Sequence, residues 1–177
     1  HKPEAGVAST TAFLVNRVAD VALLAGILLL VSMFSTADLE MLRRLMQAST
    51  LEDSQWQTMY QLPGQGLVRI SLPTGWLTAT GILLCVGALG KSAQLFFMGW
   101  LPRAMAGPTP ASAVLHAATM VAAGVVVLAR IYPMLDAPTL QLLAWVGSTT
   151  ALLAALCASV QTDLKQVLAF STVSQLG

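Results

Sequence analysis

The sequence predicts an all-α protein, a polytopic transmembrane helix bundle with one discontinuous helix. Hydrophobic residues make up 56% of the 177 residues, charged residues only 10%, and the mean hydropathy is +0.73. A soluble domain carries roughly 25% charged residues. Several apolar runs also reach the roughly 20 residues that a helix needs to cross a hydrocarbon core. We therefore expect an integral, multi-pass membrane protein.

The charged residues exclude several functional classes. Nine Lys and Arg against eight Asp and Glu leave a net charge of +1, so no basic field is available to bind nucleic acid. Cys85 and Cys157 lie in uncharged runs and predict neither a disulfide framework nor a zinc site. The sequence contains no motif for a nucleophile, phosphate loop, haem or iron–sulfur cluster. We expect no catalytic residue, cofactor, metal or redox chemistry on this chain.

The first span is expected at residues 13–34, where an apolar stretch at 21–31 follows Arg17 and Asp20. These charges and the length of the run argue against a cleavable signal peptide. The chain starts at His1 and ends at Gly177 inside an unfinished helical pattern, so it is expected to be a fragment of a larger antiporter-like fold.

The segment from 35 to 72 is more polar. A possible capping box at 35–38 precedes leucines at 39, 42 and 45, which predicts a short amphipathic helix at the membrane surface. The run Pro-Gly-Gln-Gly at 63–66 predicts a loop.

The second span, residues 76–106, is too long for one straight helix. At 1.5 Å per residue it would extend about 46 Å, beyond a hydrocarbon core of about 30 Å. Gly87 and Gly90 precede Lys91, and Pro102 follows. This pattern predicts a discontinuous helix that breaks near Gly90 and Lys91.

Three further helices are expected. Residues 109–131 follow a Gly-Pro-Thr-Pro start signal, residues 139–161 contain no charge, and residues 163–177 begin another helix. Basic residues are divided almost evenly between the two sets of loops, so the orientation in the membrane stays open.

The informative residues are the ionisable ones at membrane depth. A Lys, Arg or Asp at the centre of a span costs about 2.5–3.5 kcal/mol on insertion scales, so each requires a partner or a hydrated cavity. These candidate ion-translocation residues are Arg17, Asp20, Lys91, His116 and Lys165.

Arg17 and Asp20 are three residues apart and can pair on one helix face, either as a structural salt bridge or as part of a proton relay. Lys91 follows the predicted break, where carbonyls without partners attract an ammonium group. The low dielectric opposes the charge, which makes Lys91 a switchable proton site. Snorkelling to the interface is the alternative.

His116 shares a helix face with Ser112 and Met120, and it is either a proton-carrying group or a packing residue. Lys165 lies beside Asp163 at the start of the last helix, where it is either interfacial or part of the ion route.

Several runs together resemble the antiporter-like membrane subunits of respiratory complex I, the subunit L or chain 5 family of NADH:quinone oxidoreductase. The Mrp-type sodium/proton antiporter subunits are a close competitor. The runs are Val-Asn-Arg-Val at 15–18, Gly-Lys-Ser-Ala-Gln at 90–94, Trp-Leu-Pro at 100–102, Ala-Met-Ala-Gly-Pro-Thr-Pro at 104–110, His-Ala-Ala-Thr-Met-Val at 116–121, Asp-Leu-Lys-Gln-Val-Leu-Ala-Phe-Ser-Thr at 163–172 and Ser-Gln-Leu-Gly at 174–177.

The resemblance implies that Lys91 is the central proton-carrying lysine and that His116 continues the hydrated route. In the family, an acidic residue on the helix before the first span pairs with this lysine, and this chain is expected to begin just after that helix. Asp20 is the only acid at membrane depth before Lys91, so any pairing within this chain has to use it. Two departures from the family are evident. Arg103 stands where the family usually has an aspartate, and residues 95–99 lack the usual proline.

The expected function is therefore that of a proton-translocating membrane subunit of an NADH:quinone oxidoreductase, in a bacterial plasma membrane or an organellar inner membrane. Expected partners are other membrane subunits, the lipid bilayer and protons or Na⁺. The alternatives are a Na⁺/H⁺ antiporter subunit, a subunit of a hydrogenase or inorganic-carbon-uptake complex, and a passive membrane scaffold.

Overall fold

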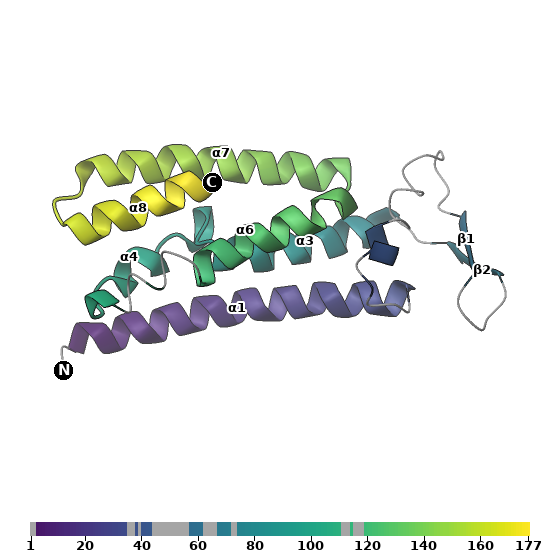
Figure 1. Ribbon diagram of the computed structural model, residues 1–177, viewed down its shortest axis with the longest axis horizontal. Helices are drawn as coiled ribbons and strands as arrows, with labels where there is room; N and C mark the ends of the chain where they lie inside the picture. Colours follow the sequence, from purple (N-terminus) through teal and green to yellow (C-terminus); the bar gives the residue numbers. More distant parts are fainter. Residues whose placement is uncertain are drawn as a thin grey trace.

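The computed structural model describes residues 3–34, 38, 40–43, 57–61, 67–71, 74–110, 114 and 119–177. Its elements form a helical bundle and a short hairpin (Figure 1). In chain order they are α1 (Pro3–Phe34), β1 (Gln57–Gln61), β2 (Leu67–Ser71), α3 (Thr74–Lys91), η1 (Leu95–Phe97), α4 (Trp100–Ala104), α6 (Met120–Ile131), η2 (Tyr132–Met134), α7 (Ala137–Val160) and α8 (Leu164–Leu176). The predicted all-α fold with one discontinuous helix is confirmed.

Helix α1 starts ten residues earlier than the apolar run indicates. Residues 5–12 are mostly small and include no proline. The hydroxyl groups of Thr10 and Thr11 donate to the carbonyls of Gly6 and Val7, at 3.1 and 2.9 Å. These bonds satisfy the polar side chains within the helix itself, so the helix continues through them.

Three helices are long and apolar enough to cross a membrane, and α3 is the central one. The windows that qualify lie in Ala5–Phe34, Gly75–Phe97 and Ala137–Val160, and they are 22%, 61% and 17% buried within the chain. Helix α3 lies between α1 and the α7/α8 pair (Figure 1). The outer helices α1 and α7 therefore leave most of their apolar surface for lipid or for neighbouring protein.

Helices α1 and α3 run antiparallel and approach closely because α3 presents glycines to α1. A Cβ atom added at Gly87 would lie 2.6 Å from the Cβ of Leu23, and one added at Gly90 would overlap the Cβ of Ala19. Small residues let membrane helices pack backbone against backbone in this way. The contact places residue 91 opposite the middle of α1.

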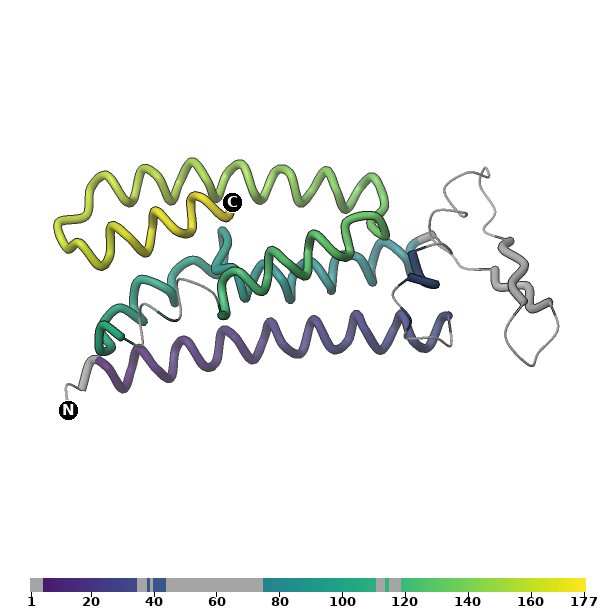
Figure 2. Tube along the Cα trace, viewed as in Figure 1, coloured from purple at the N-terminus to yellow at the C-terminus, as the bar shows by residue number. Residues whose placement is uncertain are grey.

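The last two helices form an antiparallel pair that covers the other side of α3. Asp136 caps the start of α7, where its side chain accepts a hydrogen bond from the N–H of Thr139. Helix α8 folds back along α7 and ends near the middle of the bundle (Figure 2). The hydroxyl of Ser174 donates to the carbonyl of Ala151 at 2.8 Å, which joins the two helices.

Two buried apolar clusters lie on either side of the helix break. One includes Leu30, Phe34, Leu84 and Ile131, and the other includes Trp100, Leu101, Val121, Ala154 and Val173. Both clusters combine residues from several helices, so they hold the two halves of the discontinuous span in place.

The connection between α1 and α3 is described only in part. Residues 40–43 are helical, as the amphipathic pattern predicts, and Leu42 is buried in the first apolar cluster. Strands β1 and β2 pair antiparallel with Met59 opposite Arg69. The sequence pattern does not predict this hairpin, because neither strand alternates regularly between apolar and polar residues. The predicted loop at 63–66 lies outside the described residues.

Candidate functional site

The helix break lies directly after Lys91 and has the hydrogen bonds of a Schellman motif. The N–H of Gln94 donates to the carbonyl of Leu89 at 3.0 Å, and the N–H of Ala93 donates to that of Gly90 at 3.3 Å. Ala93 has φ = 54°, the left-handed conformation that this motif requires and that glycine usually supplies. Lys91 is therefore the last residue of α3.

The connection after Lys91 has a strained backbone. Leu95 also has a positive φ of 32°, and a left-handed conformation costs a non-glycine residue roughly 1–2 kcal/mol. Hydrogen bonds to two other helices hold the connection. The N–H of Leu95 donates to the hydroxyl of Thr150 at 3.1 Å, and the buried amide of Gln94 donates to the carbonyl of Leu176 at 2.8 Å. The break is thus joined to both α7 and α8.

The carbonyls at the end of α3 have donors of their own. Ser92 donates to the carbonyl of Ala88 through both its N–H and its hydroxyl. The indole N–H of Trp100 reaches the carbonyl of Gly90 at 3.2 Å, beside the bond from Ala93. The expected attraction between free carbonyls and the Lys91 ammonium is therefore not what holds this lysine, because these carbonyls are already hydrogen-bonded.

The Lys91 ammonium instead pairs with Asp20 of α1. The Nζ atom of Lys91 lies 2.6 Å from Oδ1 of Asp20, and the two side chains are 23% and 29% exposed. Asp20 also faces Arg17, whose guanidinium lies 3.7 Å from its other oxygen but is 64% exposed. Arg17 additionally lies over the ring of Phe13, 4.8 Å from the centroid. Asp20 is consequently positioned between two cations.

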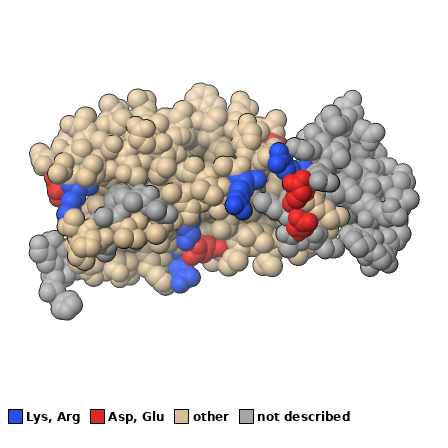
Figure 3. All heavy atoms as spheres, in the orientation of Figure 1, with Lys and Arg blue, Asp and Glu red and all other residues tan. Residues whose placement is uncertain are grey.

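The two ion pairs differ in their expected contribution to stability. The Arg17–Asp20 pair is longer, and its guanidinium is largely exposed in this chain, so we expect it to contribute less than a close, buried pair. Removing one partner of a buried pair costs about 3–5 kcal/mol, because a charge is left without compensation. The short, mostly buried Lys91–Asp20 pair is nearer to the second case. Figure 3 shows that the charged side chains on the visible face gather in a few small groups on a largely uncharged surface.

A groove of about 390 Å³ opens beside Lys91 between α1, α3 and α6. This volume can hold several water molecules, since each occupies about 30 Å³ in the liquid. The described lining is mainly apolar and comprises Leu23, Ala88, Lys91, Thr119, Met120, Ala123, Gly124 and Val127. His116, which the sequence places next on the ion route, lies outside the described residues.

Lys165 belongs to a different part of the molecule. It lies in the first turn of α8, where its N–H donates to the carboxylate of Asp163 at 3.0 Å. Leu176, at the other end of α8, accepts a hydrogen bond from Gln94 at the break. Lys165 precedes Leu176 by eleven residues, which correspond to about 16 Å along the helix. The structure therefore brings Arg17, Asp20 and Lys91 together and leaves Lys165 apart from them.

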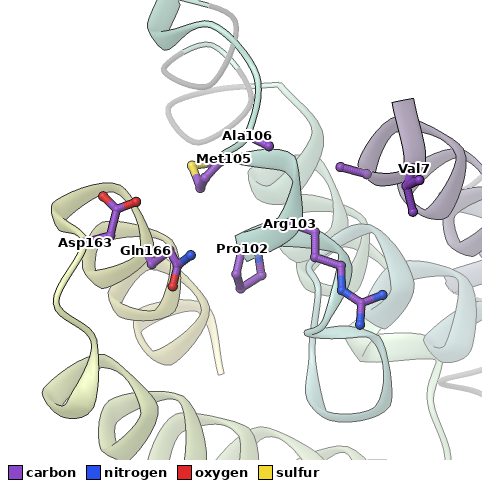
Figure 4. Close-up of a pocket in the computed structure, with 8 residues that line it drawn as sticks. Val7, Pro102, Arg103, Met105, Ala106, Asp163 and Gln166 are labelled. Atoms are coloured by element: carbon purple, nitrogen blue, oxygen red, sulfur yellow. The ribbon is translucent and has the colours of Figure 1, made fainter. Parts of the chain in front are cut away.

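Arg103, which departs from the family pattern, lines a second cavity of about 520 Å³ near the start of α8. Asp163 and Gln166 contribute to the wall opposite α4 (Figure 4). The side chains of Arg103 and Asp163 do not point toward one another in this view.

Two buried polar residues, Gln94 at the break and Asn16 on α1, were not among the sequence-predicted site residues. Gln94 is 4% exposed and Asn16 is 8% exposed, although both are polar residues in apolar segments. The signal that could have identified them is their cost of burial, since an uncharged amide in a membrane helix also requires hydrogen-bond partners.

Comparisons with known proteins give one consistent result. The model of the family described as "NADH:quinone oxidoreductase/Mrp antiporter, TM" matches residues 1–177. The "NADH-quinone oxidoreductase subunit L" of Rhodobacter capsulatus is 39% identical over 99% of this chain and 23% of its own length. The "NAD(P)H-quinone oxidoreductase subunit 5, chloroplastic" of Zygnema circumcarinatum is 42% identical, with the same coverage. The chain thus spans about a quarter of the length of these relatives.

Among solved structures, the chain is similar to one titled "Structure of Mrp complex from Dietzia sp. DQ12-45-1b". The TM-score is 0.79 and the sequence identity 31%, over 99% of this chain and 17% of that one.

Proposed function

Because the chain belongs to the NADH:quinone oxidoreductase/Mrp antiporter transmembrane family, we propose that it is part of a proton-translocating membrane subunit of an NADH:quinone oxidoreductase. In this proposal, electron transfer takes place in other subunits, and its energy changes the protonation of Lys91. The chain carries protons and not electrons, and its neighbours are other membrane subunits of the same complex.

The observation that carries this proposal is the Lys91–Asp20 ion pair at a helix break inside a membrane span. The ammonium and carboxylate are 2.6 Å apart and about three-quarters buried. Charged residues at such a depth are expensive and mark ion pathways in membrane proteins. Discontinuous helices likewise mark the sites at which membrane transporters bind ions.

The arrangement suits a lysine that gains and loses a proton. When Lys91 is neutral, Asp20 would lose its buried partner, a change that costs about 3–5 kcal/mol where nothing compensates. Arg17 stands 3.7 Å from the other carboxylate oxygen and can take over as its partner. Exchange of Asp20 between the two cations would therefore reduce the energy needed to release the proton of Lys91.

The test is proton pumping by the complete complex in reconstituted vesicles, driven by NADH. The variant Lys91→Met removes the titratable group, and we expect it to abolish most of the proton movement through this subunit. The matched variant Lys91→Arg keeps a cation for Asp20 but releases its proton far less readily, since the pKa of arginine exceeds about 12. We expect Lys91→Arg to assemble normally and to pump poorly.

The two variants also distinguish the passive-scaffold alternative. If the lysine only holds α1 against α3, Lys91→Arg will pump normally and Lys91→Met will reduce assembly without reducing pumping per assembled complex. Unchanged pumping per complex in both variants would contradict the proposal.

A Na⁺/H⁺ antiporter subunit is the second candidate, favoured by the similarity to the Mrp complex structure. It would use the same lysine without an electron donor. Proton exchange that depends on Na⁺ in vesicles without NADH would support this candidate over the first.

A further inference from the structure

Asn16 of α1 has a buried side-chain oxygen that the route described above does not use. The residue is 8% exposed, and its Oδ1 atom has no hydrogen-bond partner among the described residues. Its Nδ2 atom donates to the carbonyl of Ala12 at 2.8 Å. This bond fixes the orientation of the amide, because exchanging its oxygen and nitrogen would place two acceptors against each other.

The packing of α1 against α3 indicates where this oxygen lies. Three contacts define the antiparallel register, and they join Gly26 with Leu84, Leu23 with Gly87 and Ala19 with Gly90. Moving toward the start of α1 therefore corresponds to moving toward the end of α3. One step beyond Ala19, this register places Asn16 next to the turn at residues 92–94, which ends the broken helix.

Asn16 also shares a helix face with Asp20, because residues four apart in a helix lie one above the other. They are separated by about one turn, or roughly 6 Å along the axis. Two hydrogen bonds of about 2.8 Å that meet at one water molecule span roughly 4.5 Å, so a bridging water requires the two flexible side chains to incline toward each other.

A buried acceptor without a partner costs about 1–3 kcal/mol, so buried polar groups are normally paired with protein or water. Buried waters typically make about three hydrogen bonds to groups of this kind. The orphaned oxygen of Asn16 and the Lys91–Asp20 pair supply complementary partners. The carbonyl oxygen and the carboxylate accept hydrogen bonds, and the ammonium donates them.

We propose that the side-chain carbonyl of Asn16 binds a water molecule that hydrogen-bonds to the Lys91–Asp20 pair, and that Asn16 is thereby a positioning residue for proton transfer at Lys91. The inference rests on the proposed function of Lys91. In the transfer, an N–H bond of the ammonium breaks as an O–H bond forms on the water, which passes another of its protons to the next water. Lys91 becomes neutral, and no atom changes its oxidation state.

The variants Asn16→Leu and Asn16→Ser test this in the complete reconstituted complex. Leucine has a similar volume and no acceptor, whereas serine keeps an oxygen that can hold the water. We expect Asn16→Leu to reduce proton pumping per assembled complex by about ten-fold. This is less than the roughly 100-fold or greater loss expected when the proton-transferring group itself is removed, because Asn16 acts only through the water. Asn16→Ser is expected to restore most of the pumping.

Thr139→Val provides the matched control. Thr139 of α7 is 1% exposed, and its hydroxyl also has no partner among the described residues, but it lies against Gly81, ten residues before Lys91 on α3. Valine removes this hydroxyl with almost no change of volume. We expect normal pumping, because the hydroxyl is remote from the ion pair.

A solvent isotope measurement separates proton transfer from packing. If Asn16 positions the transferring water, Asn16→Leu will increase the ratio of pumping rates in H₂O and D₂O, and Asn16→Ser will not. Normal pumping in Asn16→Leu, or equal losses in the leucine and serine variants with an unchanged isotope ratio, would overturn the inference. If Lys91→Met abolishes pumping while Asn16→Leu does not, only this inference fails. If Lys91→Met pumps normally, the proposed function fails.

Discussion

Asp20 is the residue on which the candidate site depends most directly. It has one close, mostly buried partner in Lys91 and one distant, exposed partner in Arg17. A carboxylate between two cations can exchange partners without becoming unpaired. In the proposed function the two pairs have different tasks, because the first holds the Lys91 amine in place and the second would stabilise Asp20 whenever that amine is neutral.

Replacing each partner separately should reveal this difference. We expect Asp20→Asn to destabilise the membrane domain by about 3–5 kcal/mol, because the Lys91 ammonium loses its buried partner. Arg17→Gln should cost clearly less than Asp20→Asn, since its pair is longer and less buried. Thermal unfolding of the solubilised complex measures both effects. A larger loss in Arg17→Gln than in Asp20→Asn would contradict the assignment.

A second prediction concerns Ala93, the left-handed residue of the break. Ala93→Val places a β-branched side chain at φ = 54° in a fully buried position, and we expect a loss of at least about 1–2 kcal/mol. Ala93→Gly relieves the backbone strain but removes a buried methyl group worth about 0.8 kcal/mol, so it should be nearly neutral. The same unfolding measurement applies, and equal stability of the two variants would contradict the Schellman geometry.

At the scale of the elements, close packing of α6 against α3 keeps the broken helix in position. A Cβ atom at Gly124 of α6 would overlap both the hydroxyl of Ser92 and the carbonyl of Ala88. The second of these is backbone and cannot turn aside. Only glycine allows α6 to approach the last turn of α3 so closely, and this approach also forms one wall of the groove beside Lys91.

We therefore expect Gly124→Ala to displace α6, with a loss of about 1–3 kcal/mol in stability and reduced proton pumping. Gly6→Ala is the matched control, because a Cβ atom at Gly6 in α1 has no neighbour within 4 Å. In the interior of a helix, this change should be neutral or should stabilise by about 0.5–1 kcal/mol. If both variants have the same stability and pumping, the close approach of α6 to α3 does not explain why residue 124 is glycine.

Much of this could be predicted from the sequence, for identifiable reasons. The break at Gly90 and Lys91 follows from a segment too long for the membrane together with its glycines. Asp20 as a partner follows from its being the only acid at membrane depth before Lys91. The register between α1 and α3 could not be predicted, because the sequence does not say which of several glycines meets which residue of α1. Alanine in place of glycine at position 93 concealed the cap.

At the scale of the whole molecule, the bundle holds the Lys91–Asp20 pair between its helices and presents a largely apolar outer surface. Large exposed side chains occupy the outer faces of α1 and α7, including Val21, Leu24, Leu28, Leu152 and Leu156. An apolar surface of this extent is stable only against lipid or other membrane helices.

This arrangement predicts that the cost of inserting a charged residue depends on where along the span it is placed. Leu24→Arg places a cation on the outer face of α1 in the middle of its span, and we expect membrane insertion to become less favourable by about 2.5–3.5 kcal/mol. Leu164→Arg introduces the same residue at a more exposed site in the first turn of α8, where the side chain can reach the interface. The amount of membrane-integrated protein measures both, and similar losses would contradict this orientation of α1.

The two tethers from the break, Gln94 to Leu176 and Leu95 to Thr150, connect the lysine mechanically to the far side of the bundle. A hydrogen bond tolerates only a few tenths of an ångström of stretch before it weakens. A larger displacement of the end of α8 must therefore either break the hydrogen bond from Gln94 to Leu176 or move the left-handed turn at Ala93 as well. Because Lys91 lies only three residues before Gln94, a displacement of the end of α8 is transmitted to Lys91 through only a few residues of backbone.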